Sequence, residues 1–191
     1  WLTYTQGDLE RSREYFQKLP QASAMLTHEG LAWIYRETAD EQASRKNLEE
    51  GFPVGEQLIR GAPKAAQARR VFANLLAVSG AQMDRAEQEA RKAVELEPNN
   101  DSHGTLGFVL LSQGRHREAV ESLERALKEG HGGTPLPYYF LGKAYRGLGD
   151  EGKALHAWQQ GLENDPHHRL ILSELKGRPP KPVPKKEKAS M

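Results

Sequence analysis

Residues 141 to 166 read LGKAYRGLGDEGKALHAWQQGLENDP, and the order of residue types in this stretch decides the fold. Leu141 and Gly142 come first and Tyr145 follows one helical turn later, so the three share one face of a helix. Gly149 and Asp150 signal a turn, because glycine tolerates a positive φ and aspartate caps a following helix. The remainder alternates small and large apolar residues at helical spacing. The stretch therefore predicts two antiparallel helices joined by a tight turn.

The same pattern occurs 35 residues earlier, without a gap. The matched pairs are Leu106 with Leu141, Gly107 with Gly142, Leu110 with Tyr145, Gly114 with Gly149, Ala119 with Ala154, Leu123 with Trp158, and Ala126 with Gly161. A period of this length is typical of repeat proteins in which each unit is one helical hairpin. A hairpin alone leaves an apolar face exposed, so its stability depends on stacking against its neighbours.

The period continues towards the N-terminus in weaker form, with one extra residue expected in the turn around residues 81–83. The residues that keep it are Phe72, Ala73, Leu76, Ala86, Ala90 and Ala93, then Leu31, Ala32, Tyr35, Ser44 and Leu48, and finally Gly7, Asp8, Ser12 and Phe16. We count one truncated hairpin and four complete ones, which predicts an all-α solenoid of antiparallel helical hairpins, about five repeats in all.

Three segments follow from this count. Residues 1–62 carry the degenerate repeats, and residues 52–62 interrupt the period as either an inserted loop or an extended helix end. Residues 63–176 carry three clear repeats and a capping helix at 168–176. Residues 177–191 are rich in proline and lysine, which predicts a disordered basic tail.

The residues quoted from 141 to 166 resemble a near-complete tetratricopeptide-repeat signature. The unit from Asn100 to Gly133 is similar, although it lacks the closing proline that Pro166 supplies in the last unit. The resemblance covers residues 1–176 and is strongest from Ala66 onwards. It implies a superhelix whose first helices line a concave groove, and it implies that a partner protein binds in that groove.

Composition excludes several classes of protein. The chain has 27 basic and 26 acidic residues, so no overall charge draws it to nucleic acid. It has no cysteine, which rules out disulfides and thiolate metal sites and leaves the cytoplasm and the periplasm both open, with a slight preference for the cytoplasm. Its apolar runs are far too short to cross a membrane. It starts at Trp1 without an initiator methionine, which indicates a fragment or a processed product.

The sequence shows no catalytic or metal-binding motif. Its seven histidines are scattered without the spacing of metal ligands, and the glycines around His131 lack the spacing of a phosphate-binding loop. We therefore expect no enzyme activity, no cofactor and no metal.

The groove is the predicted functional surface. Helical geometry places Glu29 and nine candidate binding residues on the stripe beside the packing face, and aromatic and cationic side chains alternate along it. The nine candidates are Trp33, Arg36, Arg70, Asn74, Phe108, Leu111, Tyr139, Lys143 and Arg146. This stripe predicts a partner peptide or amphipathic helix that is apolar with some acidic character. The alternative is that several of these side chains simply pack between repeats.

Chaperone adaptors of the family grip a C-terminal carboxylate with a lysine/asparagine clamp spread over three repeats. Arg70 and Asn74 resemble the first pair of that clamp. Thr105, Leu136 and Phe140 stand in the remaining places, so the clamp is incomplete and this function is not expected.

The leading hypothesis is a protein-interaction scaffold or adaptor within a larger, bacterial-like assembly. Truncating Phe108 and Tyr139 to alanine should then abolish partner capture without lowering the melting temperature. The alternative is a regulatory or substrate-docking domain of a larger enzyme. For the basic tail, weak contact with an acidic surface is a third hypothesis.

Overall fold

The computed structural model describes residues 9–18, 24–80, 82–130 and 134–176, and in these ranges the chain forms ten helices and no strand. The helices are α2 (Leu9–Gln17), α3 (Ala24–Glu37), α4 (Glu41–Gly61), α5 (Ala66–Val78), α6 (Met83–Leu96), α7 (Asn100–Ser112), α8 (His116–Glu129), α9 (Pro135–Gly147), α10 (Glu151–Asn164) and α11 (Arg169–Leu175). None of these ten helices is long and apolar enough to cross a membrane.

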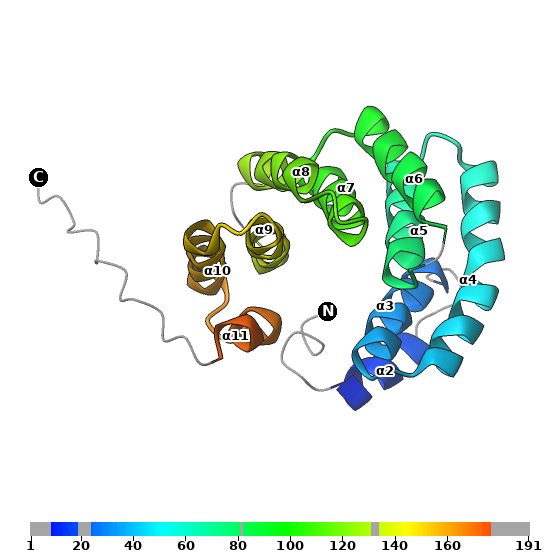
Figure 1. The fold of residues 1–191 in the computed structure, drawn as a ribbon. Coiled ribbons are helices and arrows are strands. Elements are labelled where there is room, and N and C mark those ends of the chain that lie inside the picture. The colour runs from blue at the N-terminus through cyan, green and yellow to red at the C-terminus, as the bar shows by residue number, and fades with distance from the viewer. Residues whose placement is uncertain (1–8, 19–23, 81, 131–133, 177–191) are drawn as a thin grey trace, which may run out of the picture.

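Successive helices pair as antiparallel hairpins, and the hairpins follow a curved path (Figure 1). The first helices of the hairpins, α5, α7 and α9, lie on the inner side of the curve, and the second helices, α4, α6, α8 and α10, lie on the outer side. The prediction of an α-solenoid of helical hairpins is confirmed, and α11 caps the last hairpin as expected. The N-terminal residues 1–8 and the tail 177–191 lie outside the described residues.

The last two hairpins close where a small residue of the first helix meets a large residue of the second. A Cβ on Gly107 would come within 2.5 Å of Leu123 Cγ, and a Cβ on Gly142 would overlap the indole of Trp158. Leu123 and Trp158 are fully buried, and the Trp158 ring nitrogen donates a hydrogen bond of 3.1 Å to the Tyr139 carbonyl. The absence of a side chain at these two positions therefore sets how closely the paired helices approach.

The turns within the hairpins also follow their residues. Gly114 and Gly149 take φ values of 75° and 79°, which is the left-handed region that glycine enters readily. In the second unit Ala39 takes that place with φ 53°, a conformation that costs a residue with a Cβ about 1 kcal/mol. Residues 79–82 link α5 to α6, one residue more than in the later turns. Gln82 in this turn has a positive φ of 50°, as Ala39 has in the earlier one.

Residues 52–61 belong to a helix, because α4 continues through Pro53 to Gly61. Of the two interpretations of the interrupted period, the extended helix end is the arrangement observed. Two buried glycines allow α4 to lie close to its neighbours: a Cβ on Gly51 would come within 2.8 Å of the His28 and Leu75 side chains, and one on Gly55 would overlap the Phe72 ring. The additional turns thus pack against the next hairpin.

A partly buried ionic network secures the connection between α4 and α5. Arg69 of α5 pairs with Glu89 of α6, and the Glu89 side chain is only 5 % exposed. The Arg69 guanidinium also donates a 2.8 Å hydrogen bond to the Pro63 carbonyl. Arg85 bridges Glu89 at 3.0 Å and Glu56 of α4 at 3.1 Å. Both arginines therefore pair with a carboxylate that is largely removed from water, where pairing favours its burial.

We expect Gly142→Ala to lower the free energy of unfolding by about 2 kcal/mol, because the added methyl must displace the buried Trp158 ring. Gly152→Ala is the matched control in α10, where the nearest atom to an added Cβ is Asp150 Oδ1 at 3.7 Å. This control should raise stability by about 0.5 kcal/mol through the helix propensity of alanine. Urea denaturation measures both values, and equal effects of the two substitutions would contradict the packing argument.

Candidate partner-binding surface

Three aromatic rings from three first helices meet on the inner side of the solenoid. The centroid of Trp33 in α3 lies 4.9 Å from that of Phe108 in α7 and 6.0 Å from that of Phe140 in α9. Phe108 and Phe140 are 4.8 Å apart. The curvature of the stack therefore brings α3 into side-chain contact with α7 and α9, although a complete hairpin separates α3 from α7 in sequence.

These rings are packed into the protein. Trp33 is 8 % exposed, Phe108 4 % and Phe140 6 %, while Tyr139 beside them is half-buried. The sequence left two interpretations open for Trp33 and Phe108, contact with a partner or packing between repeats. Their burial corresponds to packing between repeats. Phe140 completes the cluster but was not among the predicted groove residues. The one feature of the sequence that could have indicated Phe140 is its position next to Tyr139. The helical phase derived from the repeat placed Tyr139, and not Phe140, on the groove stripe.

A polar cluster lies between α3, α5 and α7. The Asn74 amide donates a 2.7 Å hydrogen bond to Glu29 Oε1, and Arg70 Nη2 lies 3.5 Å from Asp101 Oδ2. Glu29 is 5 % exposed, and burial raises the pKa of its carboxyl to about 7, against the opposing effects of the Asn74 hydrogen bond and the Arg70 charge. The two residues that resemble the start of a carboxylate clamp are thus engaged by carboxyl groups of the chain itself.

The cations of α9 are likewise engaged from within the chain. Glu174 of α11 pairs with Arg146 and lies 3.3 Å from Lys143 Nζ. The Arg146 guanidinium also stacks over the Trp158 ring, 4.2 Å from its centroid. A carboxylate of the capping helix therefore occupies the position where the sequence predicted that an acidic partner would bind.

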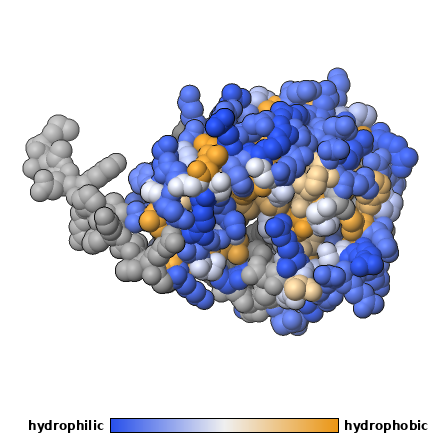
Figure 2. Space-filling model, viewed as in Figure 1, coloured by the Kyte–Doolittle hydropathy of each residue, from blue (hydrophilic) through white to orange (hydrophobic). Residues whose placement is uncertain are grey.

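The remaining predicted groove residues are more accessible. Arg36 is exposed, with its guanidinium 5.9 Å from the Trp33 ring, and Leu111 is half-buried. Lys143 is exposed as well as paired, and its ammonium lies 5.9 Å from the Tyr139 ring. Hydrophobic residues group near the middle of the face in Figure 2, within a largely hydrophilic outer surface. That all nine residues contact a partner stays a prediction.

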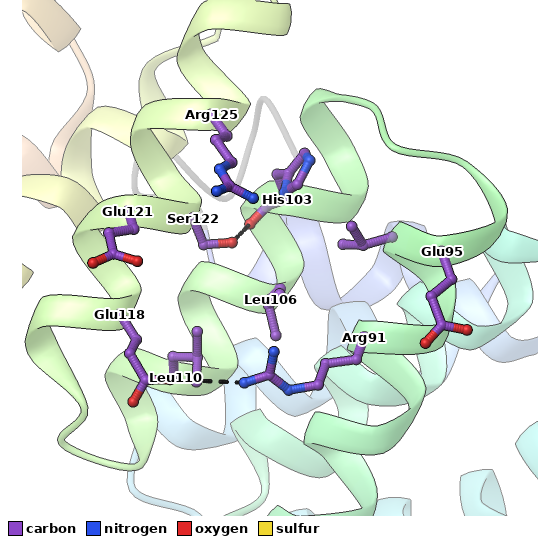
Figure 3. Close-up of a pocket in the computed structure, with 10 residues that line it drawn as sticks. Arg91, Glu95, His103, Leu106, Leu110, Glu118, Glu121, Ser122 and Arg125 are labelled. Atoms are coloured by element: carbon purple, nitrogen blue, oxygen red, sulfur yellow. Dashed lines mark hydrogen bonds and ion pairs between the residues drawn. The ribbon is translucent and has the colours of Figure 1, made fainter.

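A second concave feature lies on the outer side, between α6 and α8 with α7 as its floor (Figure 3). This cleft has a volume of about 280 Å³. It is lined by Arg91, Val94, Glu95, His103, Leu106, Leu110, Glu118, Glu121, Ser122 and Arg125. Arg91 and Glu118 face each other across one end of it, with 3.7 Å between Nη2 and Oε2.

The lining of this cleft does not assemble a catalytic group. The Ser122 hydroxyl donates to the His103 main-chain carbonyl at 3.0 Å, so it is not oriented towards a base. His103 Nε2 lies 3.7 Å from Glu129, and burial lowers the pKa of this histidine, which keeps its ring neutral at pH 7. Within the described residues no cluster of three or more histidine, aspartate or glutamate side chains could hold a metal ion.

Comparison with protein families now identifies the repeat. The tetratricopeptide-repeat model matches residues 105–169, which run from α7 to the start of α11. Residues 105–169 of the chain are therefore tetratricopeptide repeats. Tetratricopeptide repeats form a protein-interaction fold, which supports a general role for this chain as a protein-interaction scaffold.

Solved tetratricopeptide structures share the architecture. A thermophilic tetratricopeptide protein of Thermus thermophilus is 18 % identical, with a TM-score of 0.63 over 92 % of each chain. YrrB, described as having an unusual peptide-binding site, is 20 % identical, with a TM-score of 0.55 over 92 % of this chain and 87 % of its own. MamA from Desulfovibrio magneticus RS-1 is 26 % identical, with a TM-score of 0.54 over 71 % of this chain and 76 % of its own. The comparison with curated proteins finds no match.

The raised pKa of Glu29 predicts a pH-dependent stability. Between pH 4.5 and about 7 the folded tetratricopeptide chain keeps the Glu29 proton that the unfolded chain releases, so stability falls as pH rises through this window. Relative to wild type, Glu29→Gln should be nearly neutral at pH 5 and more stable by about 2.5 kcal/mol at pH 8. Glu49→Gln, an exposed position on α4, is the control. Denaturation across pH measures the difference, and a constant difference would contradict a buried neutral Glu29.

The burial of Phe108 corrects the expectation that its truncation leaves melting unchanged. Phe108→Ala removes a ring that packs against both Trp33 and Phe140, and it should lower the free energy of unfolding by about 3 kcal/mol. Leu172→Ala, at an apolar position that is 39 % exposed, should change it by less than about 0.5 kcal/mol. Thermal and urea unfolding of both variants test this, and an unaltered midpoint for Phe108→Ala would show that the ring is not part of the core.

Proposed function

We propose that this tetratricopeptide protein is a scaffold or adaptor that binds a partner peptide or helix on its inner face, within a larger, bacterial-like assembly. The observation that carries the proposal is the placement of two exposed cations, Arg36 and Lys143, beside a cluster of aromatic rings shared by three first helices. Arginine and aromatic side chains dominate the binding energy at protein interfaces.

The contacts within the chain refine which residues meet the partner. Trp33 and Phe108 form the floor on which it rests, since little of either ring is exposed. Arg36, Leu111, Tyr139 and Lys143 offer side-chain surface to it. Arg70, Asn74 and Arg146 act mainly within the protein, because Asp101, Glu29 and Glu174 engage them.

The proposed partner segment is apolar with acidic residues. Arg70, Lys143 and Arg146 each lie against a carboxylate of the chain itself, so the local geometry suits carboxylate recognition. The peptide-binding site named for YrrB supports the same class of ligand on a similar fold. We propose a binding role and no enzyme activity, in keeping with the protein-interaction repeats matched at residues 105–169.

Selection from a displayed library of random 12-residue peptides tests the proposal. The wild-type chain should enrich apolar peptides that carry aspartate or glutamate, and Arg36→Glu with Lys143→Glu should weaken their binding at least 10-fold by reversing the charge at the site. Arg45→Glu with Lys46→Glu makes the same charge change at exposed positions on α4, on the outer side, and should leave affinity unaltered. Equal loss in the two variants, or no enriched peptide, would refute an inner-face site.

A further inference from the structure

The capping helix α11 is short and depends on its packing. It spans seven residues, from Arg169 to Leu175, which is too few for a helix to be stable by itself in water. Its order therefore comes from the surface on which it lies, formed by α9 and α10. The properties of that surface can be read from the side chains that α11 places on it.

Three apolar side chains of α11 are buried: Leu170, Ile171 and Leu175. Ile171 is fully buried and fills the space left by Gly161 of α10, where an added Cβ would come within 2.5 Å of Ile171 Cδ1. Leu175 belongs to the same apolar cluster as Trp158. The surface beneath α11 thus has a pocket for a branched aliphatic side chain, next to the tryptophan.

The polar part of this surface accepts a single carboxylate. Glu174 pairs with Arg146 and Lys143, and its side chain is only 15 % exposed. Glu174 lies one turn after Leu170 and three positions after Ile171, so the carboxylate and the aliphatic groups share one helical face. The face of α11 that contacts the protein therefore has two apolar residues, two intervening residues, one glutamate and one leucine, in that order.

The residue that precedes α11 weakens the packing of this helix on α9 and α10. His168, the residue before the helix, is 1 % exposed, and neither of its ring nitrogens has a hydrogen-bond partner within the described part of the chain. A buried polar group without a partner destabilises the arrangement that buries it. A helix with an apolar residue in this place would fit the same surface without that penalty.

We propose that the surface beneath α11, formed by Lys143, Arg146, Trp158 and Gly161, is a docking site for a partner helix with the α11 pattern, and that α11 is its intramolecular occupant. The inference rests on the proposed interaction function and adds a second site to it, whose ligand is an amphipathic helix with two aliphatic residues followed by a glutamate one turn later. Since α11 is covalently linked to its site, its effective concentration there is roughly millimolar. A partner helix must therefore bind this surface more tightly than α11 does in order to displace it.

The experiment uses the full chain and a synthetic peptide of residues 167–176, HHRLILSELK. Glu174→Lys in the chain places a cation against Lys143 and Arg146 and should release α11. The peptide should then bind this variant at least 10-fold more tightly than it binds the wild-type chain. Glu163→Lys, at an exposed position of α10, makes the same charge change away from the site and should bind the peptide as wild type does. The peptide carrying Glu174→Gln should lose about 10-fold on the released variant.

Hydrogen exchange on the wild-type chain gives a second readout that requires no substitution. The amides of α11 should exchange faster than those of α9 and α10 by at least 10-fold, because the cap opens without global unfolding. Exchange of α11 only through global unfolding would overturn the proposal, as would a released α11 with no peptide binding. A dimer of the Glu174→Lys variant would assign the surface to a second copy and also overturn it. No library peptide enters this test, so its outcome is separate from that of the inner-face selection.

Discussion

The contact between a small residue of the first helix and a large residue of the second is the constraint on which this structure depends. Gly142 against Trp158 and Gly107 against Leu123 set the distance within the two best-defined hairpins. The α5–α6 hairpin has Ala73 and Ala90, two small residues, at the equivalent positions. Because the hairpin unit repeats, each step along the stack adds a similar rotation. The curved path, with first helices inside and second helices outside, follows from this repetition (Figure 1).

That curvature has a consequence beyond neighbouring units. Trp33 and Phe140 are 107 positions apart in the chain, yet their rings lie 6.0 Å apart because the intervening hairpins turn α3 towards α9. The inner face thus has a floor of buried rings, with the cations Arg36 and Lys143 beside it. A ligand on this face gains contact area from Arg36, Leu111 and Lys143 more than from the rings beneath them.

The sequence was sufficient to predict the helical hairpins, but it was insufficient to predict which side chains are exposed on the inner face. Helix phase and turn positions depend on residues within about 35 positions of one another, so Gly142, Gly149 and Trp158 predicted them from one unit. The burial of Phe108 depends on the accumulated rotation of several units, which no single repeat encodes. The hydrogen bond from Asn74 to Glu29 spans 45 positions, and the length of α4, which continues through Pro53, alters the spacing between them. Local patterns do not contain such distances.

Internal carboxylates also determine what kind of selectivity this surface can have. Lys143 and Arg146 are already paired with Glu174, so a partner carboxylate would replace an equivalent interaction, and the net gain from the charge itself would be small. A partner that lacks a carboxylate would leave Lys143 and Arg146 against apolar surface. The binding of such a partner would be opposed by the free-energy cost of leaving these charges unpaired and partly desolvated. In the proposed docking site, the charges would therefore discriminate among ligands, and the affinity would come from apolar contacts such as those that α11 makes with Trp158 and Gly161.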